Sequence, residues 1–397
     1  MVNNTLEKWE EKTLGDICLI GAGNSAPQDK DLFENGIYPF FRTADVGKIH
    51  FGKINSSEDL LNEKGIKGLK LFKKGTILIP KSGASTFLNH RVKMEVDGFV
   101  VSHLATVKGR ENVVNDDFLL YYLLTIKVQD LIQDQNYPSV NLPIISNIKI
   151  MLPPLPEQER IVAKLDEAFE AIDKVKANAE QNLNNAKELF ESALNKAFTE
   201  NTDGWEEKKL NDVCTYKSGT TISKDLESDT GDLLYIKVGD MNIRGNEEVI
   251  TTSTRFASSA EINVAQIIPT GSVIFPKRGG AIATNKKRKI IKPTIVDLNT
   301  MAIIPNKELD SNFFYHWFGQ INLIDISNGT TIPQINNYSF QNLRIKYPSL
   351  PEQQKIVEKL DALQEQTKQL EAIYTQKIKE CDELKQSILQ KAFRGEL

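Results

Sequence analysis

The residues most able to do chemistry in this sequence are basic side chains that follow short apolar runs. The segment PKSG places Lys81 and Ser82 between a proline and a glycine, and PKRG places Lys277 and Arg278 in the same setting. A strand that ends at proline and turns at glycine pushes the cation outward, which suits a contact with a phosphate group. The alternative is a solvated turn lysine.

A second basic feature is the run TNKKRKIIKP. It contains four adjacent cations, Lys286, Lys287, Arg288 and Lys289. Adjacent cations repel one another unless a polyanion lies nearby, so the run predicts a DNA contact, with a solvated charge run as the alternative. The corresponding segment of the first half, HRVK at 90–93, is weaker. Arg42 and Lys237 also occupy matching positions and could reach a base edge or a phosphate.

The segment ICLIGAGNSA, at 17–26, fits the Gly-x-Gly-x-x-Ala pattern of a dinucleotide or S-adenosylmethionine loop. Pro27 and the polar stretch after it do not open an apolar helix. The matching segment VCTYKSGTTI keeps only Gly219, which aligns with Gly23. We therefore interpret the pattern as a turn and predict no cofactor.

The sequence contains no recognisable catalytic or metal-binding pattern. Its four histidines form no pair at metal-ligand spacing, and its three cysteines are scattered. Gly-x-x-x-x-Gly-Lys-Ser/Thr, Gly-x-Ser-x-Gly and Asn-Pro-Pro-Tyr-like segments are absent. These observations predict a protein with no catalytic residues and no metal site.

The composition is that of an ordinary globular protein, with 40% hydrophobic and 26% charged residues. The sequence predicts no membrane span and no secretion signal, so a cytoplasmic location is expected. The formal net charge of −4 is unusual for a nucleic-acid binder, but clustering of basic groups matters more than their sum.

These basic segments belong to a duplication that covers nearly the whole chain. LPEQERIVAKLD at 155–166 returns about 195 residues later as LPEQQKIVEKLD. WEEKTLGDIC, GTILIPKSGAS, PSVN and ELFESALNKAF have counterparts at nearly the same spacing. Each half contains short strands such as TILIP, a short core helix such as FLLYYLLT, and then a long helix. We predict an α+β fold with domains at 1–153 and 201–348 and long helices at 154–200 and 349–397.

Each long helix carries apolar residues in steps of four and three, which is typical of a coiled-coil seam. The predicted seam residues are Ile161, Leu165, Ile172, Val175, Leu189, Ile356, Leu360, Leu363, Leu370, Tyr374, Leu384 and Ile388. Asn182 and Lys377 are predicted polar seam positions that fix the register. Because the two halves connect head to tail, we expect the two helices to pack on each other as an antiparallel coiled coil.

This arrangement resembles the DNA-specificity subunit of Type I restriction–modification systems. The resemblance rests on two α+β segments, each followed by LPEQ-x-x-IV-x-KLD and a long helix that ends in KAF, and on the final KAFRGEL. It implies two pseudo-symmetric target-recognition domains that read the two halves of a gapped site in double-stranded DNA. It also implies a non-catalytic subunit that binds two methyltransferase subunits and, through them, restriction subunits.

Two alternatives remain at this point. One is a DNA methyltransferase or nuclease that acts alone, which would need a cofactor loop or a carboxylate cluster. The other is a coiled-coil scaffold with no DNA role. Binding of S-adenosylmethionine by the isolated chain would favour the enzyme, and DNA capture that is lost at high salt would count against the scaffold.

Overall fold

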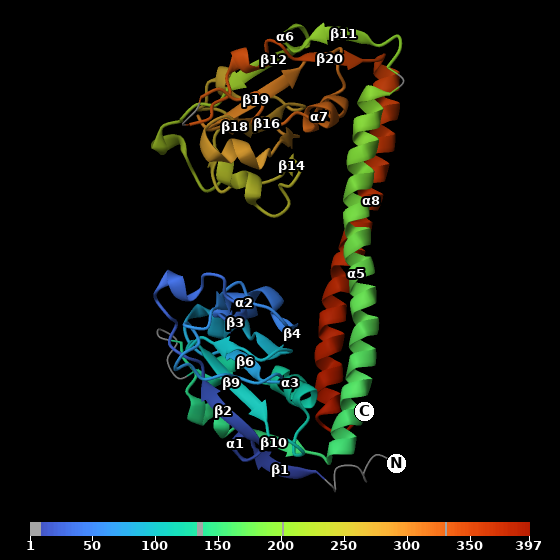
Figure 1. Ribbon diagram of the computed structural model, residues 1–397. Coiled ribbons are helices and arrows are strands. Elements are labelled where there is room, and N and C mark those ends of the chain that lie inside the picture. The colour runs from blue at the N-terminus through green and yellow to red at the C-terminus, as the bar shows by residue number, and fades with distance from the viewer. Residues whose placement is uncertain (1–8, 133–137, 201, 330–331) are drawn as a thin grey trace. The chain divides into compact units, whose positions relative to one another are not determined.

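The computed structural model describes residues 9–132, 138–200, 202–329 and 332–397. The chain forms two compact units (Figure 1). Unit 1 contains residues 1–180 and 375–397, and unit 2 contains residues 181–374. Each unit therefore contains one α+β domain and parts of both long helices, α5 (Leu155–Thr199) and α8 (Leu350–Ala392).

Unit 1 is built on a five-stranded mixed sheet with the order β2-β9-β6-β7-β4. A three-stranded sheet, β5-β3-β8, and a two-stranded sheet, β1-β10, accompany it. The strands are β1 (Glu10–Thr13), β2 (Cys18–Ala22), β3 (Tyr38–Phe41), β4 (Phe51–Ile54), β5 (Leu60–Leu61), β6 (Ile77–Pro80), β7 (Arg91–Met94), β8 (Phe99–Val100), β9 (Leu104–Gly109) and β10 (Lys149–Leu152). The helices are α1 (Leu14–Ile17), α2 (Thr43–Ile49), α3 (Asp116–Leu124) and α4 (Leu142–Ser146), with 3-10 turns η2 (Lys30–Leu32), η3 (Ala84–Leu88) and η4 (Val128–Leu131).

Unit 2 repeats this topology, with sheets β12-β19-β16-β17-β14, β15-β13-β18 and β11-β20. The strands are β11 (Glu206–Lys209), β12 (Cys214–Ser218), β13 (Leu233–Ile236), β14 (Val249–Ile250), β15 (Phe256–Ala257), β16 (Val273–Pro276), β17 (Arg288–Ile290), β18 (Thr294–Val296), β19 (Thr300–Pro305) and β20 (Arg344–Tyr347). The helices are α6 (Leu210–Val213) and α7 (Ser311–Gly319), with 3-10 turns η5 (Lys224–Leu226), η6 (Val238–Asn242), η7 (Val264–Gln266), η8 (Gly279–Thr284) and η9 (Asn337–Phe340). The predicted α+β class and the predicted duplication are confirmed.

The short apolar runs of the sequence form the centres of the two larger sheets. Every residue of β6 and of β16 is buried, because strands pair with both edges and a separate core cluster covers each face. The predicted core helices are α3 and α7, and each begins at a side-chain cap, Asn115 in unit 1 and Asp310 in unit 2.

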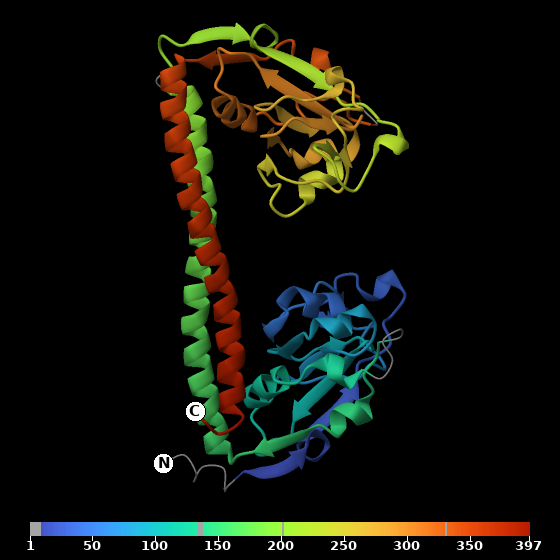
Figure 2. The same ribbon diagram turned by 180° about the vertical axis from the view of Figure 1, so that it is seen from behind.

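The two long helices run antiparallel within each unit (Figures 1 and 2). In unit 1, Lys176 pairs with Asp382 at 2.6 Å and Lys385 pairs with Asp173 at 2.5 Å. Later residues of α5 thus meet earlier residues of α8. In unit 2, the same direction brings Ala197 of α5 beside Leu360 of α8, where both line one pocket. The predicted antiparallel pairing is confirmed within each unit.

The predicted seam is correct in part. Ile161, Leu165, Ile172 and Leu360 are buried, and Ile356, Leu363, Tyr374 and Ile388 are half-buried. The other four predicted seam residues are exposed: Val175 (45%), Leu189 (49%), Leu370 (37%) and Leu384 (49%). Asn182 and Lys377 are exposed as well, so their predicted register role is wrong.

The error in the seam has a geometric cause. After Ile172 the covered line of α5 continues through Lys176, Leu183 and Phe190, each one residue later than predicted. The heptad itself continues, because Ala179 and Ala186 are buried seven residues apart on the line that starts at Ile172. The steps from Ile172 run four then three, whereas the prediction took three then four, so it placed one of the two seam lines one residue too early.

The repeated LPEQ segment fastens each long helix to its own domain. Gln158 is fully buried, accepts a hydrogen bond from the Asn115 N–H at 2.8 Å and donates to the carbonyls of Val113 and Pro153. In unit 2, Gln353 accepts from the Asp310 N–H at 2.8 Å and donates to two equivalent carbonyls. The glutamine therefore joins the start of the long helix to the N-cap of α3 or α7.

Each unit also receives an aromatic ring from the other half of the sequence. Phe393, at the end of α8, packs on Phe118 of α3 with ring centroids 5.0 Å apart. Phe198, at the end of α5, packs on Phe313 of α7 at 5.1 Å. The two KAF segments are thus exchanged between the units, which explains why the sequence carries both.

Candidate nucleic-acid interface

The turn after β6 is held in place by backbone hydrogen bonds from two distant segments. The Lys81 N–H donates to the His103 carbonyl at 3.0 Å, and the Lys81 carbonyl accepts from the Val140 N–H at 2.9 Å. The Gly83 N–H donates to the Pro138 carbonyl at 3.0 Å, and Gly83 has a φ of +75° that favours glycine. The PKSG and PSVN segments, recognised separately in the sequence, therefore form one structure.

The turn after β16 is built in the same way. The Lys277 N–H donates to the Asn299 carbonyl at 2.8 Å, and the Lys277 carbonyl accepts from the Ile335 N–H at 2.9 Å. The Gly279 N–H donates to the Pro333 carbonyl at 2.8 Å, and its φ is +71°. Both units thus hold a cation at a fixed point at the end of a buried strand.

The cations on these turns have no carboxylate partner within the described residues. Lys81 and Lys277 are half-buried and Arg278 is exposed. Burial, and then the like charge of Arg278, lower the pKa of Lys277. Ser82 lies 2.8 Å from His103 through its hydroxyl and the ring Nδ1. An anion placed here would relieve the repulsion between Lys277 and Arg278.

Two exposed apolar side chains flank the turn of unit 2, and sequence reasoning missed them. Ile332 is 57% exposed and Tyr338 is 77% exposed, one on each side of the PQIN segment. The one feature of the sequence that could have indicated them is their position next to the PQIN segment. Exposed apolar groups beside cations suit a surface that contacts bases as well as phosphates.

Arg42 and Lys237 occupy equivalent but already satisfied positions. Arg42 forms an ion pair with Asp59 and lies over the ring of Phe40, 5.2 Å from its centroid. Lys237 forms an ion pair with Glu227 at 3.2 Å and lies over Tyr235 at 5.1 Å. A DNA contact by either residue stays a prediction and would have to compete with its ion pair.

The sequence predicts a DNA contact for the whole KKRK run, but two of its members lie in the interior of unit 2. Lys287 and Arg288 are buried, with 6% and 9% exposure. Lys287 donates to the Ile321 carbonyl at 2.6 Å, and Arg288 donates to the Met241 carbonyl at 3.0 Å. Lys287 precedes β17 and Arg288 begins it, and each is buried because its side chain bonds to a backbone carbonyl.

The outer members of the run are half-buried and also have partners. Lys286 donates to the Asn242 side chain, and Lys289 donates to Asn312 at 3.2 Å and lies over Tyr315. Contacts of Lys286 and Lys289 with DNA stay predictions. Charge repulsion along the run is relieved by carbonyl and amide oxygens, which the sequence argument did not consider.

Lys287 has a counterpart in unit 1. Arg91 is fully buried and donates to Asn89 at 3.1 Å and to the Ile126 carbonyl at 3.4 Å. Lys287 donates to Asn285 at 3.0 Å in the same way. Burial lowers the pKa of Lys287 to about 8 and that of Arg91 to about 10. These two cations fix the chain that leaves α3 and α7.

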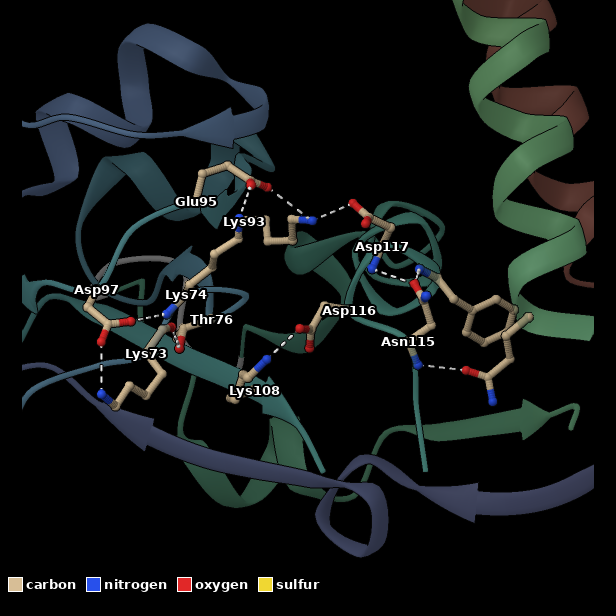
Figure 3. A network of polar contacts seen from close by, with 12 residues as sticks. Lys73, Lys74, Thr76, Lys93, Glu95, Asp97, Lys108, Asn115, Asp116 and Asp117 are labelled. Atoms are coloured by element: carbon tan, nitrogen blue, oxygen red, sulfur yellow. Dashed lines mark hydrogen bonds and ion pairs between the residues drawn. The ribbon is translucent and has the colours of Figure 1, made fainter. Parts of the chain in front are cut away.

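Unit 1 surrounds its cations with carboxylates near the start of α3 (Figure 3). Lys93 forms ion pairs with Asp117 at 2.6 Å and Glu95 at 3.1 Å, and Lys108 pairs with Asp116. Burial opposes but does not outweigh these partners, so the pKa of Lys93 is raised. These cations are neutralised within the domain and are not available for DNA.

The glycine segment of unit 1 packs closely against neighbouring backbone. Gly23 follows β2, and a Cβ there would lie 2.2 Å from the Val101 carbonyl oxygen. Gly219 is equally close to Asp297 in unit 2. Both glycines therefore permit close backbone packing. Among the described residues, no cluster of three or more histidine, cysteine, aspartate or glutamate side chains could hold a metal ion, and no helix is long and apolar enough to cross a membrane.

Comparison with known proteins finds the same family in sequence models and in curated relatives. The model of the Type I restriction modification DNA specificity domain matches this chain twice, at residues 6–185 and 202–380. The MjaIX specificity subunit of Methanocaldococcus jannaschii is 23% identical over 380 residues, covering 87% of this chain and 84% of that protein. The EcoDI specificity subunit of Escherichia coli is 23% identical over 420 residues, covering 98% and 88%.

Solved structures show the same fold. A chain from a structure of type I R-M system assembly and conformational transition has a TM-score of 0.80 at 20% identity and covers 98% of both chains. The HsdS subunit of Thermoanaerobacter tengcongensis has a TM-score of 0.60 at 21% identity, covering 98% of this chain and 97% of that one.

Proposed function

This chain belongs to the Type I restriction modification DNA specificity domain family, and from that premise we propose how it acts. It is a sequence-specific DNA-binding subunit that reads a bipartite, gapped site in double-stranded DNA. Each unit reads one half of the site. The subunit itself is non-catalytic, and methylation and cleavage belong to its partner subunits.

The two turns differ in their side chains, and this difference supports the proposal that the units read different half-sites. The two turns share every backbone hydrogen bond described above, yet one presents Lys81 and Ser82 while the other presents Lys277 and Arg278. Arginine can bind the O6 and N7 of guanine in a bidentate manner, whereas serine is less selective. An identical scaffold with different side chains supports recognition of different bases.

The long helices set the gap between the half-sites in this proposal. The helix α5 has 45 residues and α8 has 43, so each is roughly 65 Å long. The domain boundaries that accompany this role are 1–153 and 201–348 for the readers and 154–200 and 349–397 for the helices. One α-helical strut of this length exceeds a turn of DNA, about 34 Å.

The exposed apolar residues of the long helices support docking of two methyltransferase subunits. Val175 and Leu384 are exposed in unit 1, and their counterparts Leu370 and Leu189 are exposed in unit 2. Each unit therefore exposes one residue of the equivalent pair Val175 and Leu370 and one residue of the equivalent pair Leu384 and Leu189. A repeated apolar surface fits two copies of one partner, with restriction subunits joining through them.

The test of DNA reading is to sequence the sites methylated by the reconstituted complex. We expect an asymmetric, gapped site. Replacing Lys277 and Arg278 by serine should relax or change one half-site only, by a loss of about 1–3 kcal/mol of discrimination at a contacted base. Replacing Lys81 by serine is the matched change in unit 1 and should affect the other half-site. A change in both half-sites from either variant would contradict the proposal.

The test of docking uses the exposed pair Leu189 and Leu384. We expect Leu189→Gln and Leu384→Gln to weaken methyltransferase binding while the isolated chain keeps its thermal stability. Val264→Gln changes an apolar residue that is 78% exposed in unit 2 and serves as the control. Equal binding by all three variants would remove this surface from the proposal.

A further inference from the structure

Unit 2 contains a pocket of about 370 Å³ whose lining is unusually basic. It lies among the end of α5, the start of α8, α7 and the chain that enters β17. The lining residues are Phe190, Leu194, Thr284, Asn285, Lys286, Lys287, Arg288, Tyr315, His316, Gly319 and Gln364. All of them belong to unit 2.

The pocket has positive groups but no carboxylate in its lining. Lys286, Lys287 and Arg288 line it together with His316, whose Nε2 lies 2.7 Å from a carboxylate oxygen of Asp361. The Arg288 Nε is buried and has no hydrogen-bond partner among the described residues. Burial lowers the pKa of Lys287 and of Arg288, although the charges of Glu247 and Glu248 oppose the shift at Arg288. An anion in this pocket would lie beside Lys286 and the unpartnered Arg288 Nε.

Apolar residues stand at several of the equivalent positions in unit 1. Leu124 stands at the position of Gly319, Leu120 at that of Tyr315 and Val92 at that of Arg288. Leu120 is buried in one core cluster, against which Leu124 packs, and Val92 is buried in another. The equivalent of Gln364 is Phe169, which is also buried. The lining of the pocket therefore differs from unit 1 at these four positions.

The open space at α7 depends on Gly319. A Cβ built there has no heavy atom within 4 Å. A leucine, the residue at this position in unit 1, would project into unoccupied space beside Lys287, which donates to the Gly319 carbonyl at 3.4 Å. The glycine thus leaves space beside Lys287 that a leucine side chain would occupy.

We propose that this pocket binds a small phosphate-bearing ligand of the nucleoside monophosphate class. Lys286 and the unpartnered Nε of Arg288 would hold the phosphate group through charge-assisted hydrogen bonds, whereas Lys287 already donates to three oxygen atoms of the chain. Phe190 and Tyr315 supply aromatic surface for the base. The pocket volume lies within the range of about 300–1,000 Å³ that is typical of small-molecule sites. This binding goes beyond DNA reading and does not depend on it.

The experiment is calorimetric titration of the full chain with adenosine 5′-monophosphate. We expect saturable binding with a Kd below about 1 mM, and at least tenfold weaker binding of adenosine, which lacks the phosphate. Gly319→Leu should abolish binding because the side chain fills the pocket. Gly47→Leu alters a glycine in unit 1 that also has open space around it and should leave binding unchanged. Lys286→Gln should weaken binding about tenfold.

Three outcomes would overturn the proposal. One is no saturable binding of adenosine 5′-monophosphate or of inorganic phosphate at millimolar concentration. Another is equal binding by the wild-type chain and Gly319→Leu, provided that the variant keeps its thermal transition. The third is full displacement of the nucleotide by a short DNA duplex, which would assign the phosphate contact to the nucleic-acid backbone. Failure of nucleotide binding would leave the methylated-site test unaffected.

Discussion

Unit 1 and unit 2 share one backbone plan but treat their equivalent cations differently. In unit 1, Lys93 is paired with the carboxylate of Asp117, whereas in unit 2 Lys289 meets the neutral amide of Asn312. Asp116 of unit 1, which pairs with Lys108, is replaced by Ser311. The start of α3 therefore pairs its cations with carboxylates, whereas α7 begins at the carboxylate of Asp310 and places an amide beside Lys289.

The features that did not change are those that join the long helices to the domains. Gln158 and Gln353 make the same three hydrogen bonds, and the KAF phenylalanines make the same ring contacts. The duplicated architecture therefore depends on a few buried junctions. Charges around those junctions can diverge because they do not determine the backbone path.

The largest expected effect comes from removing an exchanged aromatic ring. Phe393→Ala should destabilise unit 1 by about 3 kcal/mol, and Phe198→Ala should destabilise unit 2 by a similar amount, because each leaves a cavity against a buried phenylalanine. Native-state hydrogen exchange should show faster exchange in α3 for the first variant and in α7 for the second. Faster hydrogen exchange in α7 for Phe393→Ala and in α3 for Phe198→Ala would contradict the placement of each KAF segment in the unit formed mainly by the other half of the sequence.

The glutamine junctions should give the next largest effect. Gln158→Ala and Gln353→Ala each leave one buried N–H and two carbonyls without partners, at a cost of about 2 kcal/mol. We expect similar losses in the two units by hydrogen exchange of α3 and α7. Exposed Gln181→Ala is a matched control that should change stability by less than about 0.5 kcal/mol. A large loss of stability in only one unit would contradict the proposal that the two glutamine junctions are equivalent.

The buried cations should make the units differ in their response to pH. Lys287 has a pKa of about 8 in the folded chain and 10.5 as its ordinary value. Between these values the unfolded chain binds more protons, so unit 2 should gain roughly 1–2 kcal/mol as the pH rises from 8 to 10. Arg91, with a pKa of about 10, begins to lose its proton only at the upper end of this range, so unit 1 should gain less than about 0.5 kcal/mol.

Two measurements at pH 8 and pH 10 test this: urea unfolding of the whole chain, and hydrogen exchange of the amides in α7. Lys287→Arg should abolish the gain because it places the residue of unit 1 in unit 2. Lys287→Met should also abolish it, since no titrating group remains. A gain that persists in both variants would assign the pH response to other groups.

The smallest expected effect comes from exchanging Asp117 and Asn312. Asp117→Asn removes a partner of the buried Lys93 and should destabilise unit 1 by about 1 kcal/mol. Asn312→Asp should give Lys289 an ion-pair partner and stabilise unit 2 by about 0.5 kcal/mol. Thermal unfolding at low and high salt would measure both changes, and salt should reduce them. Effects of the same sign would mean that charge compensation does not distinguish the units.

Sequence reasoning found most of the fold because duplication exposes which features recur. The strands at TILIP and SVIFP, the helices α3 and α7 and both long helices lie where their patterns predicted. It failed for Val175, Leu189, Leu370 and Leu384, because apolar residues in steps of three and four do not show whether the second seam line lies one residue later. It did not foresee the burial of Lys287 and Arg288, because charge alone does not reveal a nearby carbonyl acceptor.

The sequence by itself determined the duplication, the α+β class and the presence of two long helices, because periodicity and turn residues act locally along the chain. Only the tertiary structure decided which side chains of those helices are covered, which cations are satisfied and that PKSG joins PSVN. It also revealed the basic pocket beside Gly319. These features depend on contacts between segments far apart in the chain, and local pattern does not contain that information.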